Sequence, residues 1–296
     1  MPPCPGCGAM LAGVALRGGD RLHGLPGTFE VALCRECGSG RTLPVLPPEE
    51  LGALYPEAGY NAYALPASPP LRLLATGLFR WRYWRALRRP PLSALDGPGR
   101  LLDVGAGRGD LGVVLGERGW RVTALDPSPD ACAEAESRGV EAERGTLLEA
   151  EPRLDGGLDA VAFQHSLEHV SEPAADLEAA HRLLKPGGAV VVTLPNFGSW
   201  QRRRFGTDWF HLDLPRHRSH FTPAGIRRLL ERTGFAVESV STSTSADGLP
   251  MSVRYRRGRS GRGGLATTGL VVLGAPLSGA FGRLTDGDLL HAVGRR

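Results

Sequence analysis

The sequence predicts an α/β protein whose mostly parallel sheet carries helices on both faces, preceded by a small cysteine-rich ribbon. From Arg100 onward, apolar runs of strand length alternate with stretches of helical character, a rhythm typical of parallel sheets that are covered on both sides. Two Cys-x-x-Cys pairs stand ahead of this region. The chain has 296 residues, which is enough for one large domain and one small one.

The N-terminal segment, residues 1–45, holds two cysteine pairs at the spacing of metal-binding knuckles: Cys4 and Cys7, then Cys34 and Cys37. Zn²⁺ binds four thiolates in a tetrahedron, and the short spacing lets both thiolates of a pair face one ion. Phe29, Val31 and Leu33 alternate with other residues, which predicts a strand entering the second pair. A redox role is the alternative, but it needs only one pair, beside a βαβ unit. We therefore expect a structural zinc ribbon with no open coordination position.

Composition and net charge indicate in which compartment the protein works and which classes of partner it binds. No signal peptide is visible, so we expect a reducing cytoplasm, where paired cysteines favour metal over disulfide. The fifth cysteine, Cys132, is expected to be a small buried residue. The net charge is +4, and Lys185 is the only lysine, so nearly every cation is an arginine. Such a modest charge argues against nucleic acid as the main partner without excluding it.

Residues 46–98 are predicted to form a connecting arm and a helix. The arm, residues 46–70, is rich in proline and contains three tyrosines. Residues 71–89 favour a helix that ends before Pro90 and Pro91, with arginine and tryptophan gathered in its second half. Packing on the main domain is the plain interpretation, and a lid or a membrane-surface helix is the alternative.

Four apolar runs mark the first strands of the sheet: RLLDV from Arg100, WRVTALD from Trp120, LDAVAFQ from Leu158 and GGAVVVTLPN from Gly187. In such a sheet, ligands bind beyond the carboxyl ends of the strands. The first end reads DVGAGRG, from Asp103 to Gly109, and its glycines let a ligand approach the backbone. The second run ends at Asp126, where a carboxylate can bind two ribose hydroxyls.

The glycine loop discriminates between nucleotide ligands. A nicotinamide site favours Gly-x-Gly-x-x-Gly, but here the third glycine comes one residue early and Asp110 stands in its place. Asp103, just before the glycines, would repel a pyrophosphate and suits a ligand that carries an ammonium group. The loop therefore argues against a nicotinamide dinucleotide.

These motifs resemble those of class I S-adenosylmethionine-dependent methyltransferases. The resemblance rests, in order, on LLDVGAGRG, ALDPS, LDAVAFQHSLEHV, RLLKPGGAVVVTLPN and RRLLERTGF, over roughly residues 100–240. The final GDLLHAVGRR is similar to the family's last, antiparallel strand, and the cysteine pairs followed by LYPEAGY resemble the zinc-knuckle leader of a bacterial branch. The resemblance implies a Rossmann-like sheet of seven strands, S-adenosylmethionine as cofactor, and a methyltransferase domain over residues 99–296.

The resemblance also implies roles for individual residues. The positions that match the family's cofactor site are Asp103, Gly105, Gly107, Gly109, Asp126, Pro127, Thr146 and Gln164. The first four would hold the methionine part, Asp126 the ribose and Pro127 the adenine, while Gln164 would face the methyl donor. The family usually carries a Gly-Asp pair where this chain has Gly145 and Thr146, so the adenine contact at Thr146 departs from the pattern.

Methyl transfer from a sulfonium is an in-line displacement, so the protein must align the acceptor, and a hydroxyl or amine acceptor must also lose a proton. Three histidines are candidates for the base: His165, His217 and His220. His165 leaves a strand at the reactive end, whereas the other two lie among arginines in a segment expected to cover the substrate. Hydrogen bonds that pin this segment are the alternative for them. HSLEH also matches the inverted zinc-protease pattern, but that pattern needs a helix, and this stretch begins as a loop.

Two insertions are expected on the substrate side, residues 198–222 and 247–286. The first contains Arg202, Arg203 and Arg204 beside aromatic residues, which suits an anionic substrate or RNA, or else a solvated loop. The second contains a basic run at 254–262 and an uncharged run at 265–281, which favours two short buried helices. Weak peripheral contact with an anionic membrane, and a lipid-linked substrate, is the alternative.

The sequence thus predicts a cytoplasmic enzyme that transfers a methyl group from S-adenosylmethionine to a small-molecule acceptor, such as a sugar, an envelope intermediate or a secondary metabolite. Two alternatives stay open. An RNA methyltransferase would use the zinc ribbon and the arginines to bind nucleic acid. A non-catalytic module would bind S-adenosylmethionine without turnover.

Overall fold

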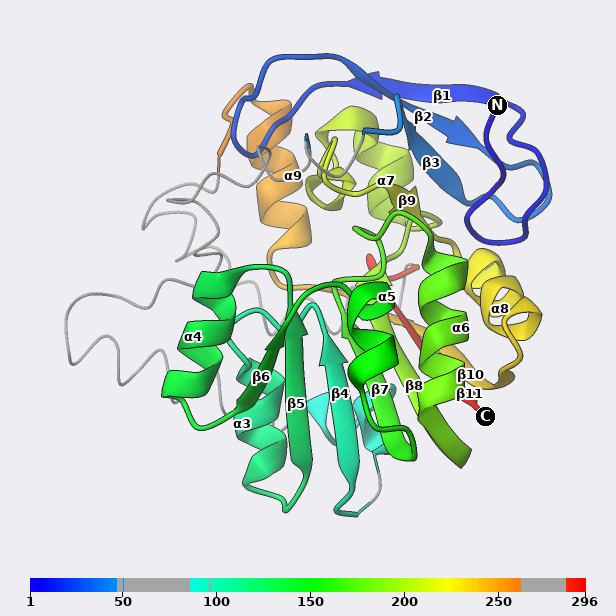
Figure 1. Cartoon of the computed structure of the whole chain (residues 1–296). Helices are drawn as coiled ribbons and strands as arrows, with labels where there is room; N and C mark the ends of the chain where they lie inside the picture. The colour runs from blue at the N-terminus through cyan, green and yellow to red at the C-terminus, as the bar shows by residue number, and fades with distance from the viewer. Residues whose placement is uncertain (47–49, 51–85, 96, 262–285) are drawn as a thin grey trace.

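The computed structural model describes residues 1–46, 50, 86–95, 97–261 and 286–296. These residues form one sheet of seven strands and one of four. Figure 1 shows the seven-stranded sheet below and the four-stranded sheet above it, near the N-terminus. Most of the predicted helix at 71–89 and all of the apolar run at 265–281 lie outside the described residues. Among the described residues, no helix has the length and hydropathy needed to cross a membrane.

The large sheet has the order β10-β11-β8-β7-β4-β5-β6. Its strands are β4 (Arg100–Val104), β5 (Arg121–Asp126), β6 (Glu141–Arg144), β7 (Leu158–Gln164), β8 (Leu184–Pro195), β10 (Ala236–Ser243) and β11 (Leu289–Arg295). β4 to β8 pair in parallel, and β11 pairs antiparallel with both β8 and β10. The predicted Rossmann-like, mostly parallel sheet of seven strands is confirmed.

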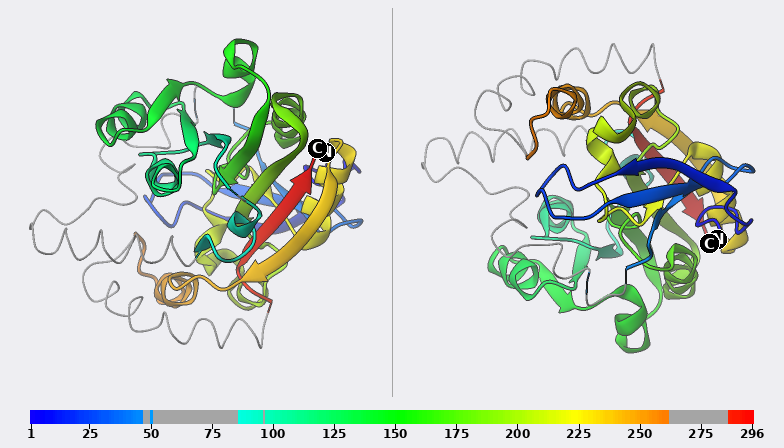
Figure 2. Two further views of the ribbon diagram at one scale, coloured as in Figure 1. Left: turned by 90° about the horizontal axis from the view of Figure 1, so that it is seen from below. Right: turned by 90° about the horizontal axis from the view of Figure 1, so that it is seen from above.

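Helices cover both faces of this sheet (Figure 2). They are α3 (Asp110–Gly116) and α4 (Pro129–Ser137) on one face, and α5 (Leu147–Ala150), α6 (Pro173–Leu183) and α8 (Pro223–Arg232) on the other. Neighbouring residues of a strand point to opposite faces, so Leu101 packs with α3 while Leu102 packs with α5, α6 and α8. Burial on both faces explains why two adjacent residues of β4, Leu101 and Leu102, are both apolar.

The ribbon forms the second sheet together with a strand from far along the chain. The order is β1 (Gly13–Gly18), β2 (Phe29–Leu33), β3 (Gly40–Leu43) and β9 (Ser219–His220). Gly40 and Arg41 of β3 pair with His220 and Ser219 of β9. A hydrophobic cluster continues this contact between β2 and the insertion at 198–222; it contains Phe29, Val31, Phe197, Phe205, Trp209, Leu212 and Leu214. The insertion includes α7 (Trp200–Phe205) and two short 3₁₀ helices, η3 (Gly206–Asp208) and η4 (Phe210–Leu212).

A buried ion pair ties the ribbon to the same insertion. The Arg216 guanidinium, 2% exposed, lies 2.6 Å from Asp20 Oδ1 and 2.6 Å from Asp213 Oδ1. On the other side of the ribbon, Arg232 of α8 donates to the carbonyl oxygens of Pro5 and Gly6, at 3.1 and 2.8 Å. These contacts attach the ribbon to the large sheet through β9 and α8, an arrangement that the sequence analysis did not predict.

Candidate functional site

The glycine loop after β4 has the backbone conformation that its glycines allow. Gly105, Gly107 and Gly109 have φ values of 72°, 54° and 73°, which lie in the left-handed region that favours glycine. A Cβ on Gly105 would lie 2.5 Å from the Cβ of Ser166, so a side chain there does not fit. A Cβ on Gly107 would meet nothing within 4 Å. The space beside the Gly107 backbone is therefore open, so a ligand could approach the loop there.

Asp126, at the end of β5, lies against this loop. Its Oδ2 accepts a hydrogen bond from the N–H of Gly107 at 2.8 Å, and its Oδ1 accepts one from the N–H of Ser128 at 2.9 Å. The side chain is 1% exposed, and burial raises the pKa of its carboxyl. Each carboxylate oxygen has a second lone pair, so both can still accept a hydroxyl of a ribose.

Asp103, the last but one residue of β4, is a buried carboxylate that lacks a full set of partners. It is 3% exposed, and its Oδ1 has no hydrogen-bond partner among the described residues. Burial, then the charges of Asp126 and Asp110, raise the pKa of Asp103 to about 7. A ligand that brings an ammonium group would relieve both the missing partner and the repulsion. The residues present therefore fit the amino acid part of S-adenosylmethionine.

The other predicted cofactor residues lie at or just after the ends of β5, β6 and β7. The hydrogen bond from Gly145 N–H to the carbonyl of Asp126, 3.1 Å long, places the turn after β6 beside it. Thr146, exposed at this turn, donates from its N–H and its hydroxyl to Glu149 Oε2, both at 2.9 Å, and so caps α5. Pro127 is exposed beside Ser128, which begins α4. Gln164, at the end of β7, has a buried Nε2 with no hydrogen-bond partner among the described residues.

His165 follows β7 in a conformation that is rare for a residue with a side chain. Its φ is 56°, and its N–H donates to the carbonyl of Thr193 in β8 at 2.8 Å. The side chain is 44% exposed, and its Nδ1 lies 3.6 Å from Glu168 Oε1. A non-glycine residue in this region of φ costs about 1–3 kcal/mol, and such strain concentrates at functional sites. Among the three predicted bases, His165 is the exposed one.

His217 and His220 are both buried, and they face different neighbours. His220 Nε2 lies 2.9 Å from Thr42 Oγ1 of the ribbon, and burial, then the charge of Arg202, lower its pKa to about 3. His217 Nε2 lies 4.0 Å from Glu168 Oε1, and burial lowers its pKa well below the usual value. The structure thus brings His165 and His217 together around Glu168 and directs His220 toward the ribbon.

Glu168 and His211 lie beside these histidines, and neither was among the predicted site residues. Glu168 is 1% exposed and lies between His165 and His217. His211 of η4 places its Nε2 3.1 Å from Oδ2 of Asp288. Burial opposes protonation of His211, but the hydrogen bond and charge of Asp288 outweigh it and raise the His211 pKa. The HSLEH motif could have indicated Glu168; nothing local in the sequence connects His211 with Asp288.

The four cysteines of the ribbon converge. Cys4 and Cys37 Sγ lie 3.5 Å apart, Cys7 and Cys34 Sγ 3.4 Å apart, and all four within 4.8 Å of one another. A zinc ion with bonds of about 2.3 Å would need thiolates about 3.8 Å apart, which is close to this arrangement. The hydrogen bond between Cys4 and Cys37 lowers the pKa of Cys37 to about 4 and raises the pKa of Cys4, which favours one thiolate in this pair. The cluster fits a tetrahedral zinc ion.

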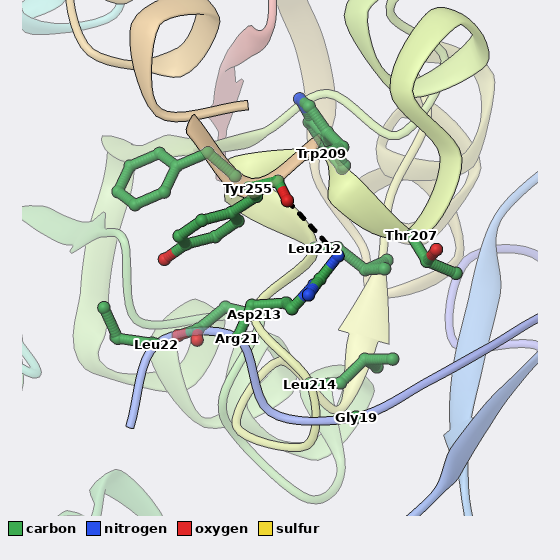
Figure 3. A pocket seen from close by; sticks show the side chains of 10 residues that line it. Gly19, Arg21, Leu22, Thr207, Trp209, Leu212, Asp213, Leu214 and Tyr255 are labelled. Atoms are coloured by element: carbon green, nitrogen blue, oxygen red, sulfur yellow. Dashed lines mark hydrogen bonds between the residues drawn. The ribbon is translucent and has the colours of Figure 1, made fainter. Parts of the chain in front are cut away.

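A small cavity lies elsewhere, between the ribbon and the insertion (Figure 3). Arg21 and Leu22 of the ribbon line one side, and Trp209 and Tyr255 line the other; Tyr255 belongs to α9 (Gly248–Arg256). None of the residues that line this cavity belongs to the glycine loop or to the ends of β4, β5 and β7.

A family model described as a methyltransferase domain matches residues 78–240. Among curated proteins, a ubiquinone biosynthesis O-methyltransferase of Xylella fastidiosa is 32% identical over 169 residues, which cover 52% of this chain and 66% of the relative. One of Aeromonas salmonicida, with the same name, is 30% identical over 173 residues, covering 54% and 71%. The match thus spans just under two thirds of the Xylella protein.

Solved structures share the fold. A SAM-dependent methyltransferase from Archaeoglobus fulgidus has 20% identity and a TM-score of 0.53, covering 76% of this chain and 99% of that one. The 1,6-didemethyltoxoflavin-N1-methyltransferase of Burkholderia thailandensis has 19% identity and a TM-score of 0.50, covering 95% and 99%. At these identities the likeness extends to the fold alone.

Proposed function

The chain belongs to the methyltransferase-domain family, and on that premise we propose that it transfers a methyl group from S-adenosylmethionine to a small-molecule acceptor. The proposal is carried by Asp103 at the start of the glycine loop, a buried carboxylate with one oxygen that no group in the described ranges contacts by a hydrogen bond. Asp126 supports it, because it lies one strand away and holds the same loop through Gly107. Together the two acids suit an ammonium group and a ribose.

In this proposal the residues of the chain bind and orient, while the cofactor supplies a methyl group activated on a sulfonium. Asp103 and the loop from Gly105 to Gly109 hold the amino acid part, and Asp126 the ribose. Pro127, Ser128 and Thr146 border the adenine, and Gln164 faces the methyl donor. His165 accepts the proton of the acceptor, because its side chain is exposed whereas His217 and His220 are buried.

We place the acceptor among small molecules, with sugars, envelope intermediates and secondary metabolites as candidates. The curated relatives support a small acceptor methylated on oxygen, since they are named ubiquinone biosynthesis O-methyltransferases. A hydroxyl acceptor also needs a base, which agrees with the exposed His165 beside the end of β7.

The ribbon, over residues 1–45, binds a structural zinc ion in this proposal. All four thiolates are needed for the ion, so the metal has no open position and takes no part in methyl transfer. The ion holds β3 against β9. Because the segment with His217 leads into β9, the ion also positions that segment. We propose three parts for the chain: the ribbon over residues 1–45, the connecting arm and helix over 46–98, and the methyltransferase domain over 99–296.

The proposal is tested with methyl-labelled S-adenosylmethionine and a cell extract that is separated into small molecules, RNA and protein after the reaction. We expect label to appear in a compound of low molecular mass with the wild-type chain. At a cofactor concentration near the wild-type KM, Asp126→Asn should reduce the labelling by about 10- to 100-fold. Asp130→Asn, a change of an exposed acid in the first turn of α4, should keep it. Label that appears in RNA, or labelling that Asp126→Asn leaves unchanged, would contradict the proposal.

A further inference from the structure

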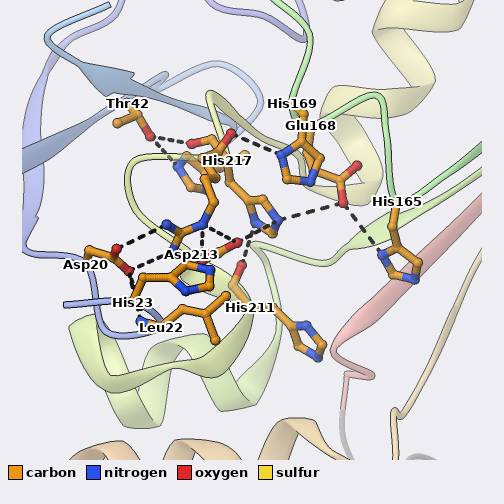
Figure 4. Close-up of polar contacts among 12 residues, drawn as sticks. Asp20, Leu22, His23, Thr42, His165, Glu168, His169, His211, Asp213 and His217 are labelled. Carbon is orange, nitrogen blue, oxygen red and sulfur yellow. Dashed lines mark hydrogen bonds and ion pairs between the residues drawn. The ribbon is translucent and has the colours of Figure 1, made fainter. Parts of the chain in front are cut away.

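Three side chains that bind metals well converge beside the loop after β7. Glu168, His169 and His217 each present one ligand atom, and these atoms lie within 4.8 Å of one another. Figure 4 shows the Glu168 carboxylate facing the rings of His165 and His217, with His169 beside it. Ligands about 2.1 Å from one ion lie roughly 3–4 Å apart, so side-chain shifts of about 1 Å would bring these atoms onto an ion.

The carboxyl group of Glu168 is buried without a hydrogen bond from any part of the chain that the structure describes. The residue is 1% exposed, and neither of its carboxylate oxygens has a hydrogen-bond partner among the described residues. Its polar neighbours are His165 Nδ1 at 3.6 Å and His217 Nε2 at 4.0 Å. Burying a carboxylate without hydrogen bonds is costly unless a cation compensates it. A cation bound between Glu168 and the histidines would supply that compensation.

Both histidines of the cluster are oriented by backbone carbonyls. His169 Nδ1 lies 3.1 Å from the carbonyl oxygen of Arg216, and His217 Nδ1 lies 2.9 Å from that of His211. A ring that donates its Nδ1–H carries the lone pair on Nε2, and this arrangement is typical of histidines that bind metals. For His217, that Nε2 is the atom that faces Glu168.

The charges around the cluster favour a cation. Asp213 Oδ2 lies 3.9 Å from His217 Nε2, and Arg216 divides its one positive charge between Asp213 and Asp20. The carboxylates of Glu168 and Asp213 thus both flank His217 Nε2, the atom that would bind the ion.

The backbone is strained on both sides of the cluster. Among the described residues, His165 and Asp213 are the non-glycine residues with positive φ, at 56° and 36°. A strained backbone persists only where surrounding contacts hold it in place, and such residues cluster at active sites and ligand sites. One strained residue stands three positions before Glu168, and the other stands four before His217.

We propose that Glu168, His169 and His217 bind a divalent transition-metal ion, separate from the ion of the cysteine cluster. Two imidazoles and one carboxylate suit Zn²⁺, Fe²⁺, Co²⁺ or Ni²⁺ better than Mg²⁺ or Ca²⁺. The ion joins the loop after β7 to the segment before β9, and three protein ligands leave coordination positions for water or for an oxygen of the acceptor. In this arrangement His217 is a metal ligand and not a base.

The full-length chain, stripped with a chelator and reloaded with Co²⁺, tests the site without reference to catalysis. We expect two equivalents of cobalt per chain. One should show intense thiolate-to-cobalt charge-transfer absorption, and the other only the weak ligand-field bands of nitrogen and oxygen ligands. A single equivalent, with thiolate absorption alone, overturns the proposal.

Variants then locate the second equivalent. Glu168→Gln and His217→Gln should each lose it and keep the thiolate band, which reports an intact ribbon. The control His181→Gln, on α6 against Phe235, should keep both equivalents. If Glu168→Gln and His217→Gln both retain the second ion, the site lies elsewhere and the proposal is wrong. Should either variant fail to fold, X-ray absorption of the wild-type zinc protein decides, because two imidazole ligands must appear beside the sulfur ligands.

Discussion

At the scale of single residues, the structure separates side chains that look equivalent in the sequence. Asp103 and Asp126 lie at the ends of neighbouring strands, yet Asp126 accepts hydrogen bonds from two backbone N–H groups, while one oxygen of Asp103 has no partner among the described residues. His165 and His220 were both candidate bases, but one is exposed and the other bonds to the ribbon at Thr42. Burial and hydrogen bonds, which the sequence does not state, make these differences.

Asp103 should make cofactor affinity depend on pH. Its pKa in the folded protein is about 7, above the ordinary 3.8, so in the free protein it is protonated below about pH 7. An ammonium ligand binds the ionised form, so binding releases a proton and affinity rises with pH up to about 7, by at most about tenfold per pH unit. Calorimetry with S-adenosylhomocysteine from pH 5 to 8 measures this. Asp103→Asn should bind weakly with a flat profile; a flat profile in the wild type would refute the assignment.

His165 should contribute to turnover and not to cofactor binding. Removal of a general base typically lowers kcat by about 10²- to 10⁴-fold. We expect His165→Gln to show a loss in this range, with the dissociation constant of S-adenosylhomocysteine unchanged within about twofold. The matched control is His181→Gln, a histidine of α6 that packs against Phe235 away from the end of β7. Unchanged kcat in His165→Gln would remove the residue from the mechanism.

At the scale of elements, the strands that are covered on both faces could be predicted from the sequence. The short or polar strands could not. β4, β5, β7 and β8 are apolar runs because each is covered on two sides. β6, Glu141–Arg144, is an edge strand of four largely polar residues, so its sequence carries no apolar signal. β9 has two residues, and it is a strand only because β3 lies beside it.

The Asp20–Arg216 pair should be the strongest polar tie between the ribbon and the insertion. Both side chains are buried, so Asp20→Asn leaves a buried guanidinium with less compensation. We expect a loss of about 3–5 kcal/mol in the free energy of unfolding, measured by urea denaturation. The control, Glu30→Gln, breaks the pair with the exposed Arg17 in the same ribbon and should cost about 1 kcal/mol or less. Equal losses in the two variants would show that burial of the Asp20 pair is not decisive.

At the scale of the whole molecule, the ribbon and the large sheet are one assembly. β9 completes the ribbon sheet, and Thr222, just after it, donates from its hydroxyl to the carbonyl of Cys37 at 2.5 Å. The sequence predicted the two parts, because each has its own local pattern of cysteines or apolar runs. It did not predict their junction, because residues such as Asp20 and Arg216 lie 196 positions apart.

Loss of zinc should therefore weaken the molecule more than the cofactor site. Cys34→Ser should remove the ribbon metal and lower the melting temperature by several degrees, because β3 no longer holds β9. The glycine loop belongs to β4 and α3, so affinity for S-adenosylhomocysteine should fall less. Metal analysis, thermal melts and calorimetry on one preparation make the comparison. Equal losses of zinc and cofactor binding would show that the ribbon is part of the cofactor site.

The central claim is that the turn after β4 holds a sulfonium amino acid while Asp126 binds its ribose. Calorimetry of the full-length chain with S-adenosylhomocysteine tests it most directly. We predict one site per chain, weakened about 10- to 100-fold by Asp126→Asn, which loses charge-assisted hydrogen bonds of about 1.5–3 kcal/mol. No heat with S-adenosylhomocysteine, together with clear binding of a nicotinamide or flavin nucleotide, would contradict it.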